Sequence, residues 1–228
     1  QLYVLEVNPR ASRTVPFVAK SIGLPIAKIA AKVMSGEKLT NLIPSLERKK
    51  LKTFNVKESV FPFNKFDGVD LILGPEMKST GEVMGIDKNF LSAYIKSQIA
   101  TGTNLPIEGN VFLSIDDDNK NKLLPIAKKL KKLNFKLITT KGTGRFLQKK
   151  KLDVTLINKV KEGNPHIVDS LLLGNINLVI NTTKTQNSIS DSYSIRRTSL
   201  MSNIPYYTTI AGAKVAVDAI EILRKNNL

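Results

Sequence analysis

The chain of 228 residues contains no cysteine, no tryptophan and a single histidine, and aromatic residues make up only 6% of it. Without cysteine it can form no disulfide framework, no zinc–thiolate site and no cysteine nucleophile, which fits a reducing cytoplasm. No apolar run reaches the roughly 18 residues of a membrane span. The first residues also lack the basic and apolar regions of a signal peptide. We therefore expect a cytoplasmic protein that makes no contact with a membrane.

The charge of the chain is unbalanced, with 35 basic against 19 acidic residues and a net charge of +16. A basic chain can bind nucleic acid. Here the positive charge comes mostly from lysine, few aromatic side chains are present for base stacking, and no nucleic-acid-binding motif occurs. Small anionic ligands are therefore favoured, and a basic nucleic-acid-binding module is kept as an alternative.

The N-terminal end begins at Gln1 without an initiator methionine and within a strand-like apolar pattern, which indicates a fragment that starts partway through a domain. In the strand expected over residues 1–8, Glu6 and Asn8 project to the same face, and Arg10 follows. A carboxylate and a carboxamide oxygen suit Mg²⁺, and a following arginine can hold a phosphate oxygen. An edge strand with solvated polar residues explains the same pattern, so both interpretations stay open.

Two helices are expected next. The first covers residues 14–22, with Ser12 as its N-cap and Gly23 at its end. The second runs between Pro25 and Gly36. Its apolar residues recur at helical spacing and predict a buried face made of Ile26, Ile29, Ala30 and Val33.

The rest of the N-terminal half is less regular. Residues 39–55 are polar and then basic, which predicts a surface loop, and residues 56–66 are apolar with an internal proline, which predicts an extended segment. Residues 73–86 are rich in glycine and methionine and predict an ordered loop without a regular element. A helix is expected over residues 89–102.

Proline, glycine and asparagine in residues 103–110 predict a linker, and we place a domain boundary there, between domains 1–107 and 108–228. Strands and helices then alternate, which predicts right-handed βαβ crossovers and a Rossmann-like α/β fold with a parallel five-stranded sheet. The strands are expected over residues 111–115, 135–140, 152–158, 177–181 and 205–210.

Small polar residues and lysines follow two of these strands, in KGTG (141–144) and NTTK (181–184). If the two strands are parallel neighbours, their ends lie side by side and form one anion-binding crevice. Gly142 and Gly144 let backbone N–H groups approach a phosphate, and the helix that begins at Thr143 points its positive end there. The polar residues at the strand ends are Ser114, Thr140, Lys141, Thr143, Asn181, Thr182 and Thr183, and Lys120 and Lys159 add charge.

No general acid–base pair is evident at this crevice, so a binding or regulatory site is favoured over a catalytic one. The single histidine, His166, precedes a helix and is interpreted as a cap or packing residue. The alternative interpretation is a sheet whose strand ends are merely polar.

Several longer stretches resemble one family. EVNPRASRTVPFVAKSIGLPIAKIAAKVMSG resembles the end of the second ATP-grasp domain of the carbamoyl phosphate synthetase large subunit, and VKESVFPFNKF and GPEMKSTGEVMG resemble the segments that follow it. TKGT, NKVKEGNPHI, INTT and DSYSIRR resemble the C-terminal allosteric domain, which has the methylglyoxal-synthase-like fold. The resemblance covers essentially the whole chain, in order.

The resemblance implies an ATP-dependent ligase that, with a glutaminase small subunit, makes carbamoyl phosphate for pyrimidine and arginine biosynthesis. The metal, Mg²⁺ or Mn²⁺, would be bound by Glu6 and Asn8, and Arg10 would be a catalytic residue that assists phosphate binding. Further nucleotide-binding residues of the family have no counterpart in this chain, so the chain alone is expected to be inactive. The family also implies an oligomer of the full heterodimer.

Two effector sites are implied as well. Ornithine would bind at the junction between domains, through Glu58, Tyr206 and Thr208. A nucleotide effector, UMP or IMP, would bind the C-terminal domain through Ser114, Lys120, Thr140, Thr143, Lys159, Asn181, Thr182, Thr183, Asp191 and Ser192.

The chain departs from the family pattern at a few positions. Tyr207 stands where an aspartate is common, and Lys141 stands where histidine is frequent, which adds positive charge beside the pocket. A stand-alone methylglyoxal synthase carries a His-Asp-His stretch after its first strand, where this chain has residues 116–118, all aspartate. That mismatch argues against the alternative of a methylglyoxal-synthase-like lyase.

Overall fold

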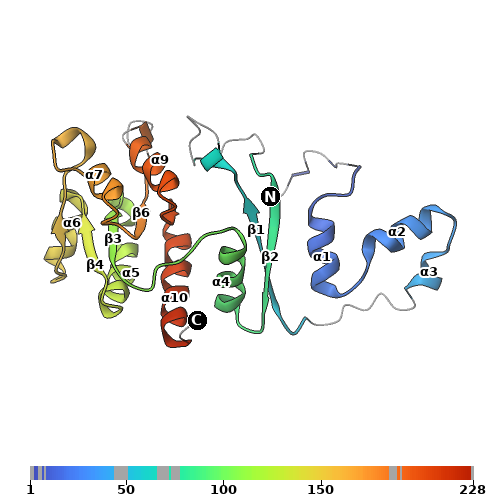
Figure 1. The fold of residues 1–228 in the computed structure, drawn as a ribbon. Coiled ribbons are helices and arrows are strands. Elements are labelled where there is room, and N and C mark those ends of the chain that lie inside the picture. Colours follow the sequence, from blue (N-terminus) through green and yellow to red (C-terminus); the bar gives the residue numbers. More distant parts are fainter. Residues whose placement is uncertain are drawn as a thin grey trace.

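The computed structural model describes residues 3, 4, 7, 9–43, 51–65, 72, 78–184, 189–190 and 192–226 (Figure 1). At one end of the molecule lie three short helices, α1 (Thr14–Ile22), α2 (Ile26–Met34) and α3 (Leu39–Leu42). At the other end lies an α/β domain, and a β-hairpin with one helix lies between the two (Figure 1). The strand expected over residues 1–8 falls largely outside the described residues.

The two N-terminal helices are confirmed, but the burial expected for the second one is wrong. Gly23 ends α1 in the left-handed region, at φ 71°, and the Ser12 hydroxyl accepts the Thr14 N–H although Arg13 occupies the N-cap position. None of the apolar residues of α2 is buried, and Val33 is 40% exposed. Helical spacing identifies an apolar face, whereas burial depends on what covers that face.

The hairpin consists of β1 (Phe54–Val60) and β2 (Gly81–Asp87), which pair antiparallel from Phe54↔Asp87 to Val60↔Gly81. The extended segment is thus confirmed in its first half, and a 3₁₀ turn, η1 (Phe63–Lys65), follows it. Two expected loops are wrong. Residues 39–55 contain α3 and the start of β1, and residues 73–86 contain most of β2.

Helix α4 (Phe90–Ala100) packs across this hairpin and confirms the helix expected there. The Asn89 side chain caps it by accepting the N–H groups of Leu91 and Ser92 at 2.9 and 3.2 Å. A Cβ at Gly85 would lie 1.9 Å from the Ala93 carbonyl oxygen, so only glycine lets α4 lie this close to β2. This contact explains why a glycine occurs within the strand. The glycine content of the segment is what led to the expectation of a loop.

The C-terminal domain has the expected five-stranded parallel sheet, in the order β5-β4-β3-β6-β7. The strands are short, and β5 covers only two of the seven residues expected for it. Their bounds are β3 (Asn110–Ser114), β4 (Lys136–Thr139), β5 (Thr155–Leu156), β6 (Leu178–Asn181) and β7 (Tyr206–Tyr207).

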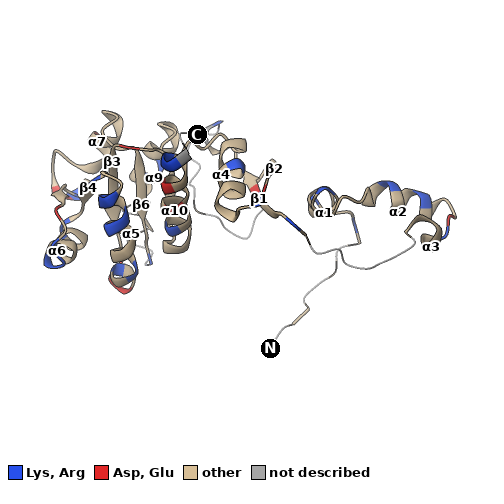
Figure 2. Cartoon of the chain, turned by 90° about the horizontal axis from the view of Figure 1, so that it is seen from below, with Lys and Arg blue, Asp and Glu red and all other residues tan. Residues whose placement is uncertain are grey.

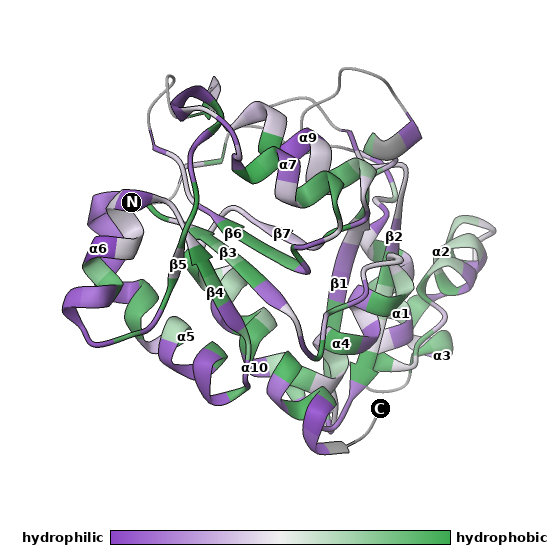
Figure 3. Cartoon of the chain, turned by 60° about the vertical axis from the view of Figure 1, so that its left-hand side comes forward, coloured by the Kyte–Doolittle hydropathy of each residue, from purple (hydrophilic) through white to green (hydrophobic). Residues whose placement is uncertain are grey.

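Helices cover both faces of this sheet (Figure 3). On one face, α5 (Lys120–Lys132), α6 (Lys141–Lys149) and α10 (Ile210–Asn226) contribute to a core with Leu113, Leu137 and Ile180. On the other face, α7 (Ile167–Leu172) and α9 (Tyr193–Met201) pack around Phe112 and Val179. Strand residues therefore alternate between two buried clusters, as a parallel sheet covered on both sides requires.

The start of α6 and the lysines of α5 can be compared with the sequence predictions. Helix α6 begins at Lys141, so the KGTG stretch forms its first turn and no loop precedes it. A Cβ at Gly144 would lie 2.2 Å from a Leu156 methyl carbon and 2.5 Å from the Thr139 hydroxyl, which explains the second glycine by close packing. Lysines lie along α5, as expected for a basic outer face (Figure 2).

Helix α4 also packs on the C-terminal domain. Ile95 of α4 shares a small cluster with Ala219 and Leu223 of α10. The Tyr94 and Tyr207 hydroxyls lie 3.2 Å apart. One helix therefore joins the hairpin to the sheet domain.

Candidate functional site: a strand-end crevice and a neighbouring cavity

The first candidate site lies where β3 and β4 end and α6 begins. Ser114 ends β3 and Thr140 follows β4, and their hydroxyl oxygens lie 3.3 Å apart. We call Ser114, Lys120, Thr140 and the first turn of α6 the strand-end crevice. The sequence allows β4 and β6 to be neighbouring strands. In the structure they are not neighbours, because β3 lies between them.

The first turn of α6 offers backbone donors to this crevice. Thr140 occupies the N-cap position, yet no side chain caps the helix. The Lys120 ammonium lies 3.8 Å from the position that a Cβ on Gly142 would take, and it pairs with Asp117 at 2.5 Å. An uncapped helix N-terminus with a lysine and two hydroxyls beside it is suited to an anion such as phosphate.

Thr143 has a different position from the one its sequence context suggested. Its side chain is only 1% exposed, and its hydroxyl oxygen accepts the Ile115 N–H at 3.0 Å. The hydroxyl thus satisfies a buried backbone donor in the segment after β3. Thr143 therefore has a structural role: it fixes the segment after β3 to the first turn of α6.

The residues at and just after the end of β6 form hydrogen bonds with other parts of the domain. Asn181 donates from its side-chain amide to the Tyr206 hydroxyl at 2.6 Å. The Thr182 hydroxyl donates to the Asp116 carboxylate and accepts the Asp116 N–H at 3.2 Å. Burial opposes ionisation of Asp116, but hydrogen bonds from Thr182 and Asn119 outweigh it and lower the pKa of that carboxyl. Thr183 is half-buried and lines a polar hollow beside Lys184.

Two of the remaining expected nucleotide contacts, Lys159 and Ser192, lie among the described residues. Lys159 is exposed, and its backbone N–H donates to Glu162, which also pairs with Lys141 at 3.4 Å. Ser192 is 8% exposed and precedes α9. Asp191 lies outside the described residues.

His166, expected to be a cap or packing residue, is a helix cap. The His166 side chain accepts the Asp169 N–H at 3.4 Å, and Asp169 accepts the His166 N–H at 2.8 Å. This reciprocal pair closes the first turn of α7.

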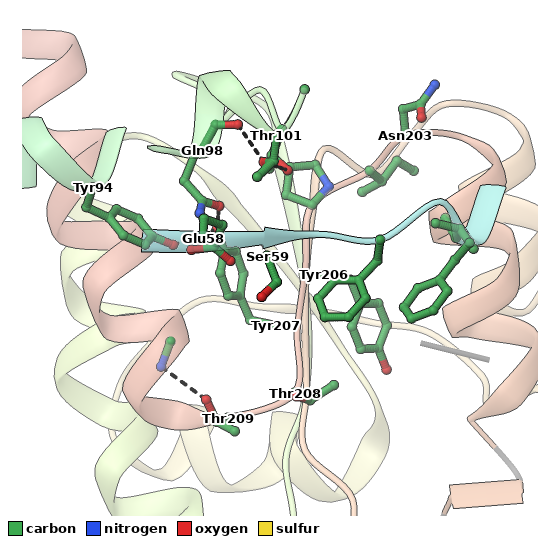
Figure 4. A pocket seen from close by; sticks show the side chains of 18 residues that line it. Glu58, Ser59, Tyr94, Gln98, Thr101, Asn203, Tyr206, Tyr207, Thr208 and Thr209 are labelled. Atoms are coloured by element: carbon green, nitrogen blue, oxygen red, sulfur yellow. Dashed lines mark hydrogen bonds between the residues drawn. The ribbon is translucent and has the colours of Figure 1, made fainter. Parts of the chain in front are cut away.

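The second candidate site is a cavity of about 610 Å³ between α4, β1 and β7, which we call the α4–β7 cavity (Figure 4). It brings Glu58 together with Tyr206 and Thr208, which follow it by 148 and 150 positions along the chain. Residues outside the expected set of ligand contacts also line it, among them Phe61, Phe63, Tyr94, Gln98 and Tyr207. Of these, only Tyr207 carried a signal, as a departure from the family pattern.

The electrostatics of the α4–β7 cavity centre on Glu58. Burial raises the pKa of its carboxyl above the ordinary value. Burial also raises the pKa of Tyr94, and burial together with Tyr94 and Glu58 raises the pKa of Tyr207 far above that of a free phenol. Both phenols therefore stay neutral, and the Tyr207 hydroxyl donates to the Gln98 side-chain oxygen at 3.4 Å.

The expected metal site lies at the other end of the chain. Glu6 and Asn8 lie outside the described residues, and Arg10 is exposed. Within the described part of the chain, no group of three or more His, Cys, Asp or Glu residues is placed to hold a metal ion. No helix in that described part is long and apolar enough to cross a membrane.

The fold and the two sites define a class of protein: an MGS-like domain joined to the end of an ATP-binding domain. A family model of the MGS-like domain matches residues 122–208, and a model described as carbamoyl-phosphate synthase L chain, ATP binding domain, matches residues 1–42.

The family is identified by relatives whose similarity covers the whole of this chain, or nearly all of it. The carbamoyl phosphate synthase large chain of Rhizobium meliloti (strain 1021) is 53% identical over 231 residues, which cover all of this chain and 20% of the relative. The large chain of Methanocorpusculum labreanum is 49% identical over 227 residues, covering all of this chain and 21% of that relative. A protein of Aquifex aeolicus (strain VF5) named carbamoyl phosphate synthase large chain, C-terminal section, is 48% identical over 240 residues, covering 99% of this chain and 45% of the relative.

The chain thus belongs to the carbamoyl phosphate synthase large-chain family, and it spans about a fifth of the full-length relatives. The α/β fold with a five-stranded parallel sheet, preceded by the end of an ATP-grasp-type domain, is confirmed.

Proposed function

We propose that this chain is the regulatory end of the large subunit of a glutamine-hydrolysing carbamoyl phosphate synthetase, and that its C-terminal domain binds a nucleotide effector such as UMP or IMP. The observation that carries the proposal is the convergence of Ser114, Lys120 and Thr140 on the uncapped first turn of α6. These groups suit the phosphate of a nucleotide. Lys159, Asn181, Thr182, Thr183, Asp191 and Ser192 complete the proposed nucleotide site.

The rest of the proposal concerns the whole enzyme. The complete subunit would use ATP and Mg²⁺ or Mn²⁺, work with a glutaminase small subunit in the cytoplasm, and assemble as an oligomer of the heterodimer. Glu6 and Asn8 are the proposed metal ligands, and Arg10 would assist phosphate binding. The relatives, which carry the name carbamoyl phosphate synthase large chain, support this assignment.

A second part of the proposal concerns the α4–β7 cavity. We propose that it binds ornithine, or a related amine, through Glu58, Tyr206 and Thr208. A half-buried carboxylate with a raised pKa suits an ammonium partner, because a nearby cation stabilises its charged form.

Calorimetric titration of the full chain with UMP and with IMP tests the nucleotide site. We expect binding of at least one nucleotide and a loss of about tenfold in affinity for Lys120→Ala, because one charge-assisted phosphate contact is removed. Lys128→Ala is the matched control, since Lys128 lies on the same helix, is exposed and forms no ion pair with a described residue. Absence of binding by both nucleotides, or an equal loss in both variants, would contradict the proposal.

A further inference from the structure

The loop between β5 and α7 carries Lys159, one of the proposed nucleotide contacts. The loop is closed at its base, where the Asn158 carbonyl oxygen accepts the Ile167 N–H at 3.2 Å. The Asn158 side-chain amide also donates to the Gly163 carbonyl oxygen at 3.2 Å. The middle of the loop forms a 3₁₀ turn, η3 (Val160–Glu162). The position of Lys159, which directly precedes this turn, therefore depends on what holds the turn in place.

Glu162 joins this turn to α6. One of its carboxylate oxygens accepts the Lys159 backbone N–H at 3.2 Å and also lies 3.4 Å from the Lys141 ammonium. The hydrogen bond from the Lys159 N–H lowers the pKa of the Glu162 carboxyl, and Lys141 adds to this effect against the opposing effect of burial. The carboxylate is therefore ionised at neutral pH, and it links the loop to the first residue of α6.

Two lysines from different elements are thus held near the first turn of α6. The Lys120 ammonium of α5 lies close to Gly142, and the Lys159 loop is attached to the same turn through the contact between Lys141 and Glu162. A phosphate at this turn would meet the two lysines together only while the loop stays attached. Loss of the ion pair would let the loop move away although Lys159 itself is unchanged.

We propose that Lys141 is a positioning residue of the nucleotide site, because its ion pair with Glu162 keeps the Lys159 loop against the first turn of α6. An ion pair between exposed side chains adds little to the stability of a fold. Holding a loop in the position that a ligand needs does raise the apparent affinity, because less order has to be gained on binding. This inference rests on the proposed nucleotide site and deepens it.

Calorimetric titration of the full chain with UMP and with IMP compares Lys141→Met and Glu162→Gln with the unmodified chain. Both variants break the ion pair, and a glutamine can still accept the Lys159 N–H. We expect each variant to bind about fivefold more weakly, as when the loop spends about a fifth of its time in the bound position. By charge alone, removal of a carboxylate beside an anion site would tighten binding. Unchanged or tighter binding by Glu162→Gln would therefore overturn the inference.

Three further variants test whether Lys141 and Glu162 act as a unit. The double variant should bind no more weakly than either single variant, and a further loss of about fivefold would mean that Lys141 binds the phosphate itself. Lys141→Arg keeps the charge and should restore the affinity, whereas the same loss as in Lys141→Met would contradict the ion pair. Asp153→Asn, which removes a carboxylate that pairs with Lys131 and is 93% exposed, is the control and should leave binding unchanged.

NMR order parameters of the backbone amides of residues 159–162 measure the loop directly, without a nucleotide. We expect them to fall in Lys141→Met and Glu162→Gln and to stay unchanged in Asp153→Asn, with the same thermal unfolding transition in all three. Equal order parameters in the unmodified chain and in the two ion-pair variants would overturn the inference.

Failure of the nucleotide site and failure of this inference give different results. If neither nucleotide binds the unmodified chain, the proposed nucleotide site is wrong and this inference fails with it. If a nucleotide binds and Lys120→Ala weakens its binding, while Lys141→Met and Glu162→Gln do not, the nucleotide site stands and the role of Lys141 is wrong.

Discussion

The hydroxyl of Tyr206 accepts a hydrogen bond from the side-chain amide of Asn181, with 2.6 Å between the two atoms. Asn181 ends β6 beside Ser114, with which it pairs in the sheet, while Tyr206 lines the α4–β7 cavity. One hydrogen bond therefore joins a residue of the proposed nucleotide site to a residue of the proposed amine site.

Tyr206→Phe removes this acceptor and leaves the Asn181 amide, which is 2% exposed, without it. We expect the free energy of unfolding to fall by about 1–3 kcal/mol, the cost of a buried polar group that loses its partner. Denaturant unfolding measures the change. In the Asn181→Ala background the same substitution should cost much less, and equal costs in both backgrounds would show that the hydrogen bond is not responsible.

Thr143→Val keeps the shape of the side chain and removes the hydroxyl that accepts the Ile115 N–H. Because that N–H is buried, we expect a loss of about 1–3 kcal/mol in the free energy of unfolding. Thr155→Val, at an exposed position of β5, is the control and should change stability by less than about 0.5 kcal/mol. Similar melting temperatures for the two variants would refute the structural role of Thr143.

Gly85→Ala places a methyl group 1.9 Å from the Ala93 carbonyl oxygen and 2.7 Å from the Ser97 backbone nitrogen. Both atoms belong to the backbone of α4, so the helix itself has to shift, and we expect a destabilisation of about 1–3 kcal/mol or more. Gly81→Ala lies in the same strand, where an added Cβ meets no atom within 4 Å. Thermal unfolding should separate the two variants clearly, and coincident transitions would argue against the close contact.

Asp218 of α10 accepts hydrogen bonds from Lys129 of α5 at 2.7 Å and from Lys214 at 2.8 Å. Burial opposes its ionisation, but these two lysines outweigh burial and lower the pKa of Asp218. A lowered pKa in the folded state stabilises the fold above the unfolded-state pKa, and this contribution is lost as the pH falls through the folded-state pKa.

Asp218→Asn should therefore be less stable than the unmodified chain at pH 7, and the difference should shrink below about pH 4. Urea unfolding over this pH range gives the measurement. Asp153→Asn removes an ion pair whose carboxylate is 93% exposed, so its effect should be small at every pH. A difference for Asp218→Asn that grows toward acid pH would contradict the sign of the pKa shift.

The sequence predicts the sheet domain well because its signals are local. Alternation of apolar strands and amphipathic helices is enough to predict a parallel sheet, and the position of His166 before a helix suggests a cap or packing role. The prediction fails where a long-range contact decides the structure. Gly85 lies within a strand because α4 approaches it, and the KGTG turn is helical although its glycines suggest a loop.

The candidate sites show the same limit. Ser114, Thr140 and Lys120 could be found from strand ends and loop composition, because parallel strands bring their carboxyl ends to one edge. The buried hydrogen bond of Thr143 and the hydrogen bond between Asn181 and Tyr206 depend on the directions of their side chains. The spacing of residues along the sequence does not predict these directions. The α4–β7 cavity joins residues from β1 and β7, so only the resemblance to the family pointed to it.

The packing of α4 bears on where this chain can be cut. The linker at residues 103–110 is the natural cleavage point by composition, but α4 lies before it and covers Ala219 and Leu223 of α10. A piece that starts at residue 108 would expose these apolar side chains and the Tyr207 phenol to water. A piece that starts before β1 would keep the hairpin, α4 and this cover of α10 together, so it should be the more soluble and better-folded version of the domain.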